Sequence, residues 1–228
     1  MINFEQLTRN IKGDVMTDSL HQMIYATDAS AYREMPLAVV YPRDASDVKA
    51  CIGFARENGI TLIPRAAGTS LAGQVVGNGV VVDVSRYMNC VLEINEEEHW
   101  VRVEPGVVLD ELNMRVKSLG LFFGPETSTS NRCCLGGMVG NNSCGSHSLV
   151  YGSTRDHLLE AKVILSNGEE VVLKGLEKKE VLDKMTCDSL EGKIYKCAVE
   201  MLEKNGEEIV QHFPDSALRR RNSGYAID

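Results

Sequence analysis

The sequence predicts an α+β fold in which a small parallel three-stranded β/α unit is followed by a larger, mostly antiparallel sheet with flanking helices. Apolar runs within residues 38–84 follow a β-α-β-loop-β order, and parallel strands need crossover connections of this kind. Beyond residue 90, pairs of apolar runs flank short polar turns, which is typical of antiparallel hairpins.

The first strand of the parallel unit is expected at residues 38–41. Asp44 or Ser46 can then cap a helix that ends at Asn58-Gly59, because short polar side chains accept from the first free N–H groups and glycine adopts the left-handed conformation at the end. Four residues at helical spacing give this helix one apolar face: Val48, Cys51, Ile52 and Ala55.

Two further strands are expected at residues 61–63 and 80–84, and a glycine-containing loop, Arg65 to Gly73, leaves the end of the first of them. Ligands of α/β folds usually bind at that edge of the sheet. A second such stretch runs from Leu135 to Gly145, and Tyr151-Gly152-Ser153-Thr154 follows. Because glycine lets main-chain N–H groups approach an anion closely, two such loops indicate one elongated, phosphate-bearing cofactor.

The antiparallel part is expected to contain two hairpins. Residues 91–94 and 100–103 flank the first polar turn, and residues 161–165 and 170–173 flank Ser166-Asn167-Gly168, where Asn-Gly is a strong hairpin signal. Between the hairpins, helical spacing ends at Gly120 and involves Leu109, Leu112, Val116 and Leu119.

Helical spacing also marks both ends of the chain. Residues 1–35 carry it with a break near Gly13-Asp14, and residues 176–213 are charged and helical. The apolar stripe of the second segment comprises Leu190, Ile194, Cys197, Met201 and Leu202. The last residues, Ser223 to Asp228, place the apolar Tyr225, Ala226 and Ile227 directly after the turn signal Ser223-Gly224. We therefore expect that the sequence is a fragment of a longer chain.

Composition narrows the class of protein. The 228 residues carry 24 basic and 32 acidic side chains, a net charge of −8, so a nucleic-acid partner is not expected. Seven cysteines occur without a regular framework, and we interpret them as reduced thiols. Neither a signal peptide nor a transmembrane segment is expected. We therefore expect a cytoplasmic protein, with peripheral inner-membrane association of a full-length protein as an alternative.

Several common sites are excluded by spacing. Gly68 and Gly73 have P-loop spacing, but Gln74-Val75 replaces the Lys and Ser or Thr that would hold phosphate and magnesium. The Rossmann fingerprint G-x-G-x-x-G is absent from every expected strand-to-helix turn. Cys133, Cys134, Cys144 and His147 do not match zinc spacings, and a Cys144/His147 nucleophile pair lacks an orienting group.

The motifs together resemble, in order, the FAD-linked oxidases of the vanillyl-alcohol oxidase type, the family of the PCMH-type FAD-binding domain, and within it the D-lactate and glycolate dehydrogenase branch. The resemblance spans residues 36–175 and, more weakly, the tail. The matching stretches are Pro42 to Val48, Pro64 to Gly73, Leu135 to Gly145, Tyr151 to Thr154 and Ser223-Gly224-Tyr225.

This resemblance implies where FAD is held. The first loop would wrap the pyrophosphate with main-chain N–H groups, through Arg65, Ala66, Ala67, Gly68, Thr69, Ser70 and Gly73. The flavin and ribityl region would be lined by Pro125, Glu126, Thr127, Ser128, Cys134, Gly136 and Gly137, with Asn142, Ser143, Gly145 and Gly152 nearby. The backbone of Val163 and Ile164 would meet the adenine.

The chain departs from the family pattern at three of these positions. Ala66 and Ala67 stand where two glycines are common, and Cys134 stands where threonine is common. Some relatives attach the flavin through a histidine in the first loop, and Thr69 occupies that place. The expected FAD is therefore non-covalent.

The resemblance also implies an organisation and an activity. Residues 1–35 would be a helical arm, residues 36–90 and 91–213 the two FAD-binding subdomains, and residues 214–228 the start of a truncated substrate or cap domain. The implied reaction is hydride transfer from a small 2-hydroxy acid to flavin N5, with a separate electron acceptor. The catalytic groups are unknown and are expected in the remaining C-terminal domain, so the fragment alone would be inactive.

An iron–sulfur cluster could lie only beyond Asp228, because no C-x-x-C-x-x-C series and no other metal site is present in the sequence. Two alternatives remain open at this point. One is a non-catalytic scaffold that has kept the fold and lost flavin, which Ala66, Ala67 and Cys134 favour. The other is a reductase that shares the flavin module and uses a nicotinamide donor.

Overall fold

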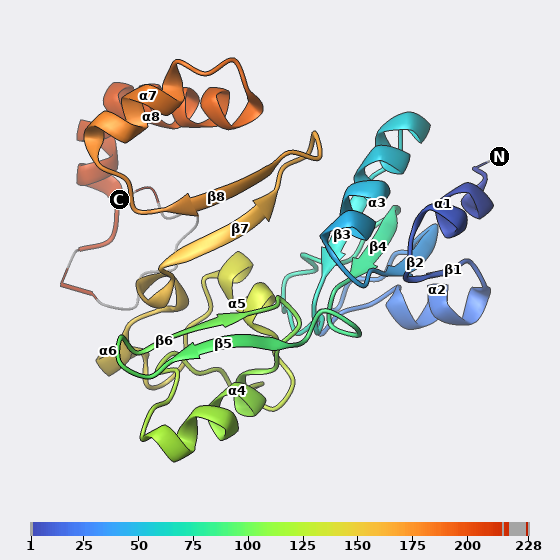
Figure 1. Ribbon diagram of the computed structural model, residues 1–228, viewed down its shortest axis with the longest axis horizontal. Coiled ribbons are helices and arrows are strands. Elements are labelled where there is room, and N and C mark those ends of the chain that lie inside the picture. The colour runs from blue at the N-terminus through green and yellow to red at the C-terminus, as the bar shows by residue number, and fades with distance from the viewer. Residues whose placement is uncertain (1, 216, 219–226, 228) are drawn as a thin grey trace.

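The computed structural model describes residues 2–215, 217, 218 and 227. In this part the chain has an α+β fold with a four-stranded sheet and two separate two-stranded hairpins, drawn in Figure 1. The Ser223-Gly224-Tyr225 motif lies outside the described residues.

The four-stranded sheet confirms the predicted parallel unit. β2 (Ala38–Tyr41), β4 (Val80–Asp83) and β3 (Leu62–Arg65) are parallel neighbours in that order. β1 (Asp14–Met16) adds an antiparallel edge beside β2. The sequence analysis did not predict β1, because three residues between two helices carry too little alternation to mark a strand.

The predicted helix between the first two parallel strands is α3 (Ala45–Asn58), and both of its ends are formed as expected. The Asp44 side chain accepts from the N–H groups of Ser46 and Asp47, and Gly59 ends the helix in the left-handed conformation with φ 63°. The buried face differs from the expected one, since Phe54 and Asp47 are buried alongside Cys51 and Ala55.

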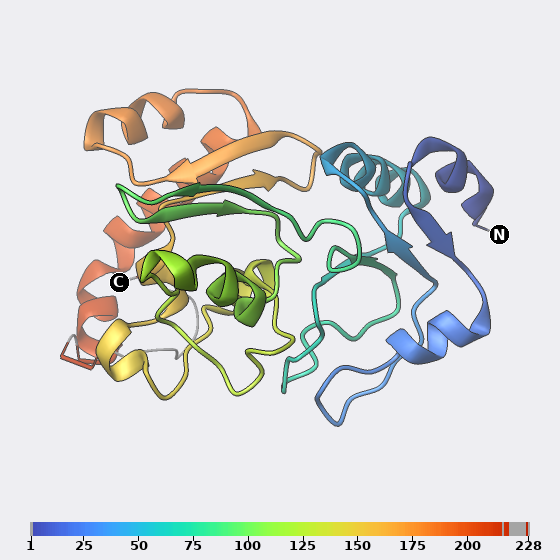
Figure 2. The same cartoon turned by 60° about the horizontal axis from the view of Figure 1, so that its bottom comes forward.

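The sheet is buried on both faces. One face packs against α3 and α1 (Phe4–Asn10) through Ala38, Val40, Val80 and Val82. The other face carries Val39, Tyr41, Ile63 and Val81 and is covered partly by Tyr25, which ends α2 (Ser19–Tyr25). Figure 2 shows α3 and α2 on opposite sides of these strands.

The two predicted antiparallel hairpins are confirmed. β5 (Val91–Asn95) pairs with β6 (Trp100–Val103), and β7 (Glu160–Ile164) pairs with β8 (Glu170–Lys174). They do not merge into one larger sheet. Side chains bridge them instead, since Arg102 Nη1 lies 2.6 Å from Glu160 Oε1.

Short helices pack against the first hairpin. α4 (Leu109–Val116), a 3-10 turn (Lys117–Leu119) and α5 (Leu135–Asn141) follow in chain order. Gly120 ends the 3-10 turn with φ 71°, as the sequence predicted. The buried residues of this cluster are Val107, Leu109, Leu112, Val116, Cys133, Leu135 and Met138. α6 (Ser148–Tyr151) and a second 3-10 turn (Thr154–His157) lead to β7.

The predicted helical segment near the C-terminus consists of α7 (Lys178–Met185) and α8 (Leu190–His212). Its apolar stripe faces solvent, since Ile194 and Met201 are 46% and 42% exposed. Among the described residues, no helix combines the length and apolar character needed to cross a membrane.

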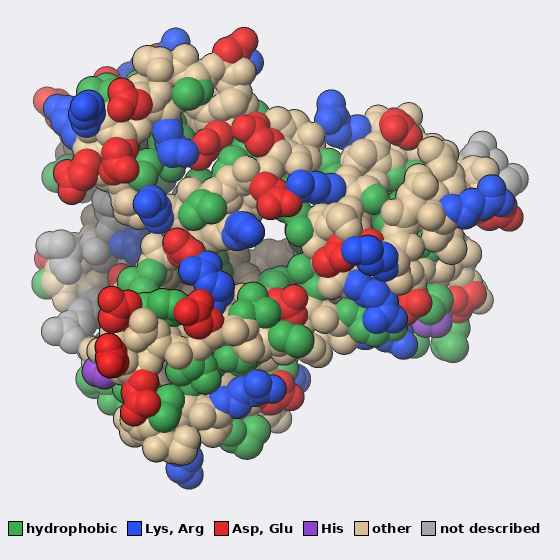
Figure 3. Space-filling view, in the orientation of Figure 1, with side chains coloured by type: hydrophobic (Ala, Val, Ile, Leu, Met, Phe, Trp, Pro, Cys, Tyr) green, Lys and Arg blue, Asp and Glu red, His purple; other side chains and the backbone are tan. Residues whose placement is uncertain are grey.

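The two halves of the described chain have separate apolar clusters. The N-terminal half (residues 2–87) contains two of the apolar clusters, and the C-terminal half (from residue 91) contains the third. Between the halves, Lys49 Nζ lies 2.7 Å from Glu170 Oε1, and Arg56 donates to the carbonyl of Asn167 over 3.2 Å. On the face drawn in Figure 3, acidic and basic side chains are interspersed.

A buried carboxylate organises the N-terminal half. Asp47 is 1% exposed, and it accepts from the main-chain N–H groups of Lys12, Gly13 and Arg43, each over 2.9 Å. A side chain at Gly13 would not fit, because its Cβ would lie 2.0 Å from the Tyr41 carbonyl oxygen. Asp47 therefore joins α3 to the turns that enter β1 and leave β2.

We expect Asp47→Ala to lower the free energy of unfolding by roughly 3 kcal/mol, because three buried N–H groups lose a charged acceptor. Asp47→Asn, which keeps one carbonyl oxygen, should lose less. Urea unfolding measures both, with the exposed Glu57 as the control, since Glu57→Ala should change stability by less than about 0.5 kcal/mol. Equal stability of Asp47→Ala and the control would contradict this role.

Candidate functional site

The first glycine loop begins where β3 ends, at Arg65. Gly68 and Gly73 have φ values of 66° and 72°, a conformation that residues with a Cβ rarely adopt. Among the described residues, the main-chain N–H groups of Gly68, Thr69, Ser70 and Leu71 donate no hydrogen bond. The loop therefore presents a run of free donors at the carboxyl end of the parallel sheet.

The second glycine stretch contacts the first. A Cβ on Gly137 would lie 3.3 Å from the Cβ of Ala66, and Gln74 donates to Asn141 Oδ1 over 3.2 Å. Gly136 lies against Pro105, where a Cβ would be only 2.5 Å from the proline Cβ. In Figure 2 the segment between β3 and β4 accordingly lies next to the C-terminal half. The two glycine-rich stretches thus lie side by side.

Cys134 lies where these two stretches touch. Its side chain is buried, and the main chain of Ala67 lies near its thiol. Burial, reinforced by the charge of Asp83, raises the pKa of the Cys134 thiol to about 11. The thiol therefore stays neutral near pH 7, and it donates to the Arg132 carbonyl over 3.7 Å.

The third glycine step supports the end of α5. Asn142 closes α5 in the left-handed conformation, with φ 45°, and its Oδ1 accepts from the N–H of Arg155 over 3.0 Å. The Ser143 carbonyl accepts from the N–H and the hydroxyl of Thr154, over 3.0 and 2.7 Å. Gly152, with φ 79°, permits the turn that brings Thr154 there.

The stretch from Pro125 to Ser128 packs against Gly145. A Cβ on Gly145 would lie 1.9 Å from the Glu126 carbonyl oxygen, so only glycine fits. The Glu126 carboxylate accepts from Ser146 Oγ over 3.0 Å and lies 3.1 Å from His147 Nδ1. The structure thus brings residues 125–128, 142–145 and 152–154 together.

Val163 and Ile164 lie farther along the chain, in β7, which pairs with β8 and contacts α3. Their expected contact with adenine remains a prediction. The same holds for each of the other expected cofactor contacts, since the described geometry concerns the protein alone.

A polar network beneath the first loop was missed by the sequence analysis. Asp83, at the end of β4, is 4% exposed and accepts from the Tyr25 hydroxyl over 2.6 Å. The N–H and Oγ of Ser85 also donate to it, over 2.7 and 2.6 Å. An aspartate that ends an otherwise apolar strand was the available signal, because a buried charge needs partners.

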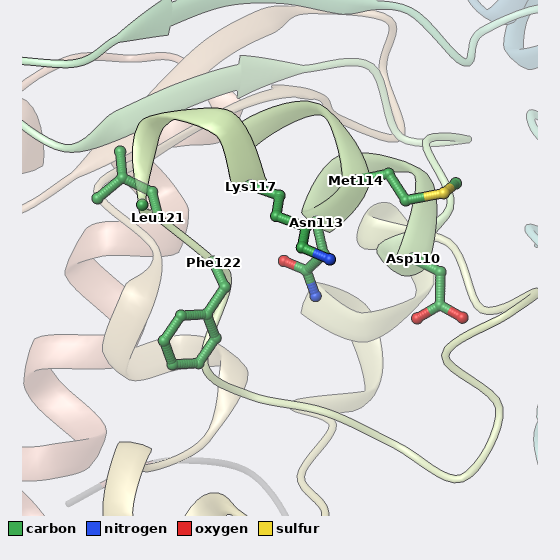
Figure 4. A pocket seen from close by; sticks show the side chains of 7 residues that line it. Asp110, Asn113, Met114, Lys117, Leu121 and Phe122 are labelled. Atoms are coloured by element: carbon green, nitrogen blue, oxygen red, sulfur yellow. The ribbon is translucent and has the colours of Figure 1, made fainter.

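The surface has a hollow beside the first glycine loop and another along α4. One, of about 260 Å³, lies between Tyr32, Arg33 and Glu34 on one side and Ala72, Gly73 and Val76 on the other. The second, of about 590 Å³, lies along α4 and includes the exposed Met114 and Phe122, as Figure 4 shows. None of the residues that line the second hollow belongs to a glycine loop, so it is separate from the candidate site.

Comparison with known proteins identifies the family of this chain. Residues 36–174 match the family described as FAD binding domain. The chain is 40% identical over 229 aligned positions to D-2-hydroxyglutarate dehydrogenase of Pseudomonas putida, covering 98% of this chain and 23% of that protein. It is 34% identical to the glycolate oxidase subunit GlcD of Bacillus subtilis, covering 70% of this chain and 34% of that protein.

The fold comparison agrees with the predicted fold class. The structure of 6-hydroxy-D-nicotine oxidase from Arthrobacter nicotinovorans superimposes with a TM-score of 0.65 at 23% identity, over 75% of this chain and 38% of the other. The chain therefore spans about a quarter to two fifths of the lengths of the proteins compared here.

We expect Cys134 to react with iodoacetamide at least about 100-fold more slowly at pH 8 than the exposed Cys90 and Cys187, because its sulfur is buried and the thiolate fraction is low. The rate at Cys134 should rise about tenfold per pH unit between pH 7 and 9. Time-resolved mass spectrometry of the alkylated peptides measures both. Labelling of Cys134 as fast as that of Cys90 would contradict the buried placement.

Proposed function

Because this chain belongs to the FAD binding domain family, we propose that it binds FAD non-covalently between its two glycine stretches and serves as the flavin-binding part of a dehydrogenase for 2-hydroxy acids. FAD is the cofactor of the family, and the expected FAD-linked oxidase resemblance is confirmed. The activity, the substrate and the electron acceptor of the whole protein are part of the proposal, since the chain spans 23% of the D-2-hydroxyglutarate dehydrogenase.

The observation that carries the proposal is the meeting of the two glycine stretches. The free N–H groups of residues 68–71 lie at the carboxyl end of the parallel sheet, and Gly137 faces Ala66 across the contact. Fixed main-chain dipoles can hold a pyrophosphate without a cationic side chain. The residues present therefore fit the phosphate part of FAD.

The three departures from the family pattern are compatible with this fit. Ala66 packs its methyl group against Gly137, and the main chain of Ala67 lies near the thiol of Cys134. Both alanines thus have contacts within the protein, and the four free N–H groups follow them in the chain. Thr69 stands where some similar proteins have the histidine that bonds to flavin, which supports a non-covalent cofactor.

The proposed substrate class follows from what the named relatives share. D-2-hydroxyglutarate and glycolate each carry a hydroxyl on the carbon next to a carboxylate. Bound FAD would supply the two-electron acceptor for oxidation of that carbon. The residues of this chain would bind and orient the cofactor, whereas the carboxylate clamp and the base are proposed to lie in the part of the longer relatives that this chain does not match.

We expect Gly68→Glu to raise the dissociation constant for FAD by at least about 100-fold, or 2.7 kcal/mol. The new Cβ would lie 2.5 Å from Arg65 Nη2 at φ 66°, and its carboxylate would repel phosphate. Quenching of flavin fluorescence on titration measures the constant.

The matched control is Gly53→Glu, which adds the same charge on α3 where a Cβ meets nothing within 4 Å. It should bind FAD as the unchanged protein does. Equal binding by both variants would place FAD elsewhere, and no binding by the unchanged chain would favour the scaffold that has lost flavin.

The next experiment uses a full-length protein that contains this chain, reconstituted with FAD. Under anaerobic conditions a 2-hydroxy acid should bleach its visible flavin absorbance, because oxidation of the substrate reduces the flavin. A parallel sample receives NADPH. Bleaching by NADPH alone would instead support the reductase alternative, and a screen of D- and L-2-hydroxy acids would identify the substrate stereochemistry.

A further inference from the structure

The segment from Tyr25 to Arg33 precedes the matched family region, which begins at residue 36, yet it contacts the first glycine loop repeatedly. It forms a loop of its own that is closed at the base, where the N–H of Glu34 donates to the Ala26 carbonyl over 2.9 Å. Thr27 and Arg33 form a bridge across it. These pairings restrict the conformation of the segment, so it can hold a neighbouring loop in place.

The first contact is made by Arg65, whose guanidinium points toward this segment. It donates to the Thr27 carbonyl over 2.9 Å and to the Tyr25 carbonyl over 3.5 Å, and it lies over the Tyr25 ring at 4.9 Å from the ring centre. The missing side chain of Gly68 makes room for this guanidinium, 2.5 Å from where a Cβ would be. The loop thus folds over Arg65.

Two further contacts hold the loop along its length. The N–H of Ala29 donates to the Gly68 carbonyl over 3.1 Å. The Tyr32 ring packs where a side chain on Gly73 would be, with its Cδ2 atom 2.7 Å from that Cβ position. Both glycines with a left-handed conformation in the loop are therefore in contact with this segment.

Tyr25 anchors the segment to the sheet. Its hydroxyl donates to Asp83, which the Ser85 N–H and hydroxyl also hold. Burial, together with this hydrogen bond, raises the pKa of Tyr25 above its usual range, so the hydroxyl stays a neutral donor. The support for the loop is therefore tied to the end of β4, beside β3 from which the loop departs.

We propose that Tyr25 and Arg65 are positioning residues for the cofactor site: with Ala29 and Tyr32 they hold the first glycine loop in the conformation that leaves its N–H groups free for a pyrophosphate. This inference rests on the proposed FAD binding for its ligand. It assigns the side chain of Arg65 to the support of the loop rather than to direct contact with the phosphate.

The test uses Arg65→Lys, which keeps the positive charge but loses the planar group that stacks on Tyr25 and donates to two carbonyls. We expect amide hydrogen exchange of Ala29 and Glu34, whose N–H groups donate to the Gly68 and Ala26 carbonyls, to become at least about tenfold faster in the cofactor-free protein. The dissociation constant for FAD should rise about tenfold as the binding-competent fraction falls. Tyr25→Phe, which removes only the hydroxyl, should shift both quantities in the same direction by less.

Leu7→Ala is the control for general destabilisation, because Leu7 is buried in the cluster on the α1 and α3 side of the sheet. It should lower the thermal midpoint while leaving exchange of Ala29 and Glu34 at the unchanged rate. The proposal is overturned if Arg65→Lys matches the unchanged protein in exchange and FAD binding, or if Leu7→Ala speeds exchange of Ala29 and Glu34 equally. Absence of FAD binding by the unchanged chain would refute the proposed function, and the exchange rates would still decide whether this segment holds the loop.

Discussion

The parallel pairing of β3 with β4 is the constraint on which the site depends. In this register Arg65 lies opposite Asp83, so the first glycine loop and the buried carboxylate beneath it leave the sheet at the same edge. Burial of both faces of the sheet fixes the register, because a shift by one residue would turn Val81 and Ile63 toward the wrong cluster. Asp83 accepts from the Tyr25 hydroxyl, and the Tyr25 carbonyl in turn accepts from Arg65 at the start of the loop.

Local signals predicted much of the fold. The capped helix α3 and the Asn-Gly hairpin of β7 and β8 were found where the sequence placed them, because caps and turns depend on residues close in the chain. β1 was missed, and the two hairpins remain separate, because pairing between distant strands leaves little trace in either strand alone. The exposed stripe of α8 shows the same limit, since helical spacing reveals a face but not what covers it.

Sequence reasoning placed the glycine stretches in one site but missed the side chains that support them. Gly68 and Gly137 carry strong local signals, and the contact between Ala66 and Gly137 agrees with that reasoning. Tyr25 lies 58 residues from Asp83 in the chain, and nothing around either residue indicates the other. Arg65 was assigned to the cofactor by resemblance, whereas its hydrogen bonds to main-chain carbonyls emerge only from the folded arrangement.

The joint between the two halves differs along its length. No apolar cluster contains residues of both halves, and the contacts at the tip of the second hairpin are an ion pair and a hydrogen bond. Water can replace these two contacts at small free-energy cost, whereas Ala66 against Gly137 and Ala67 beside the buried Cys134 join the halves at the glycine stretches. The tip of the second hairpin is therefore the part of the joint that separates at least cost, and the relative placement of the two glycine stretches depends on the buried contacts around Cys134.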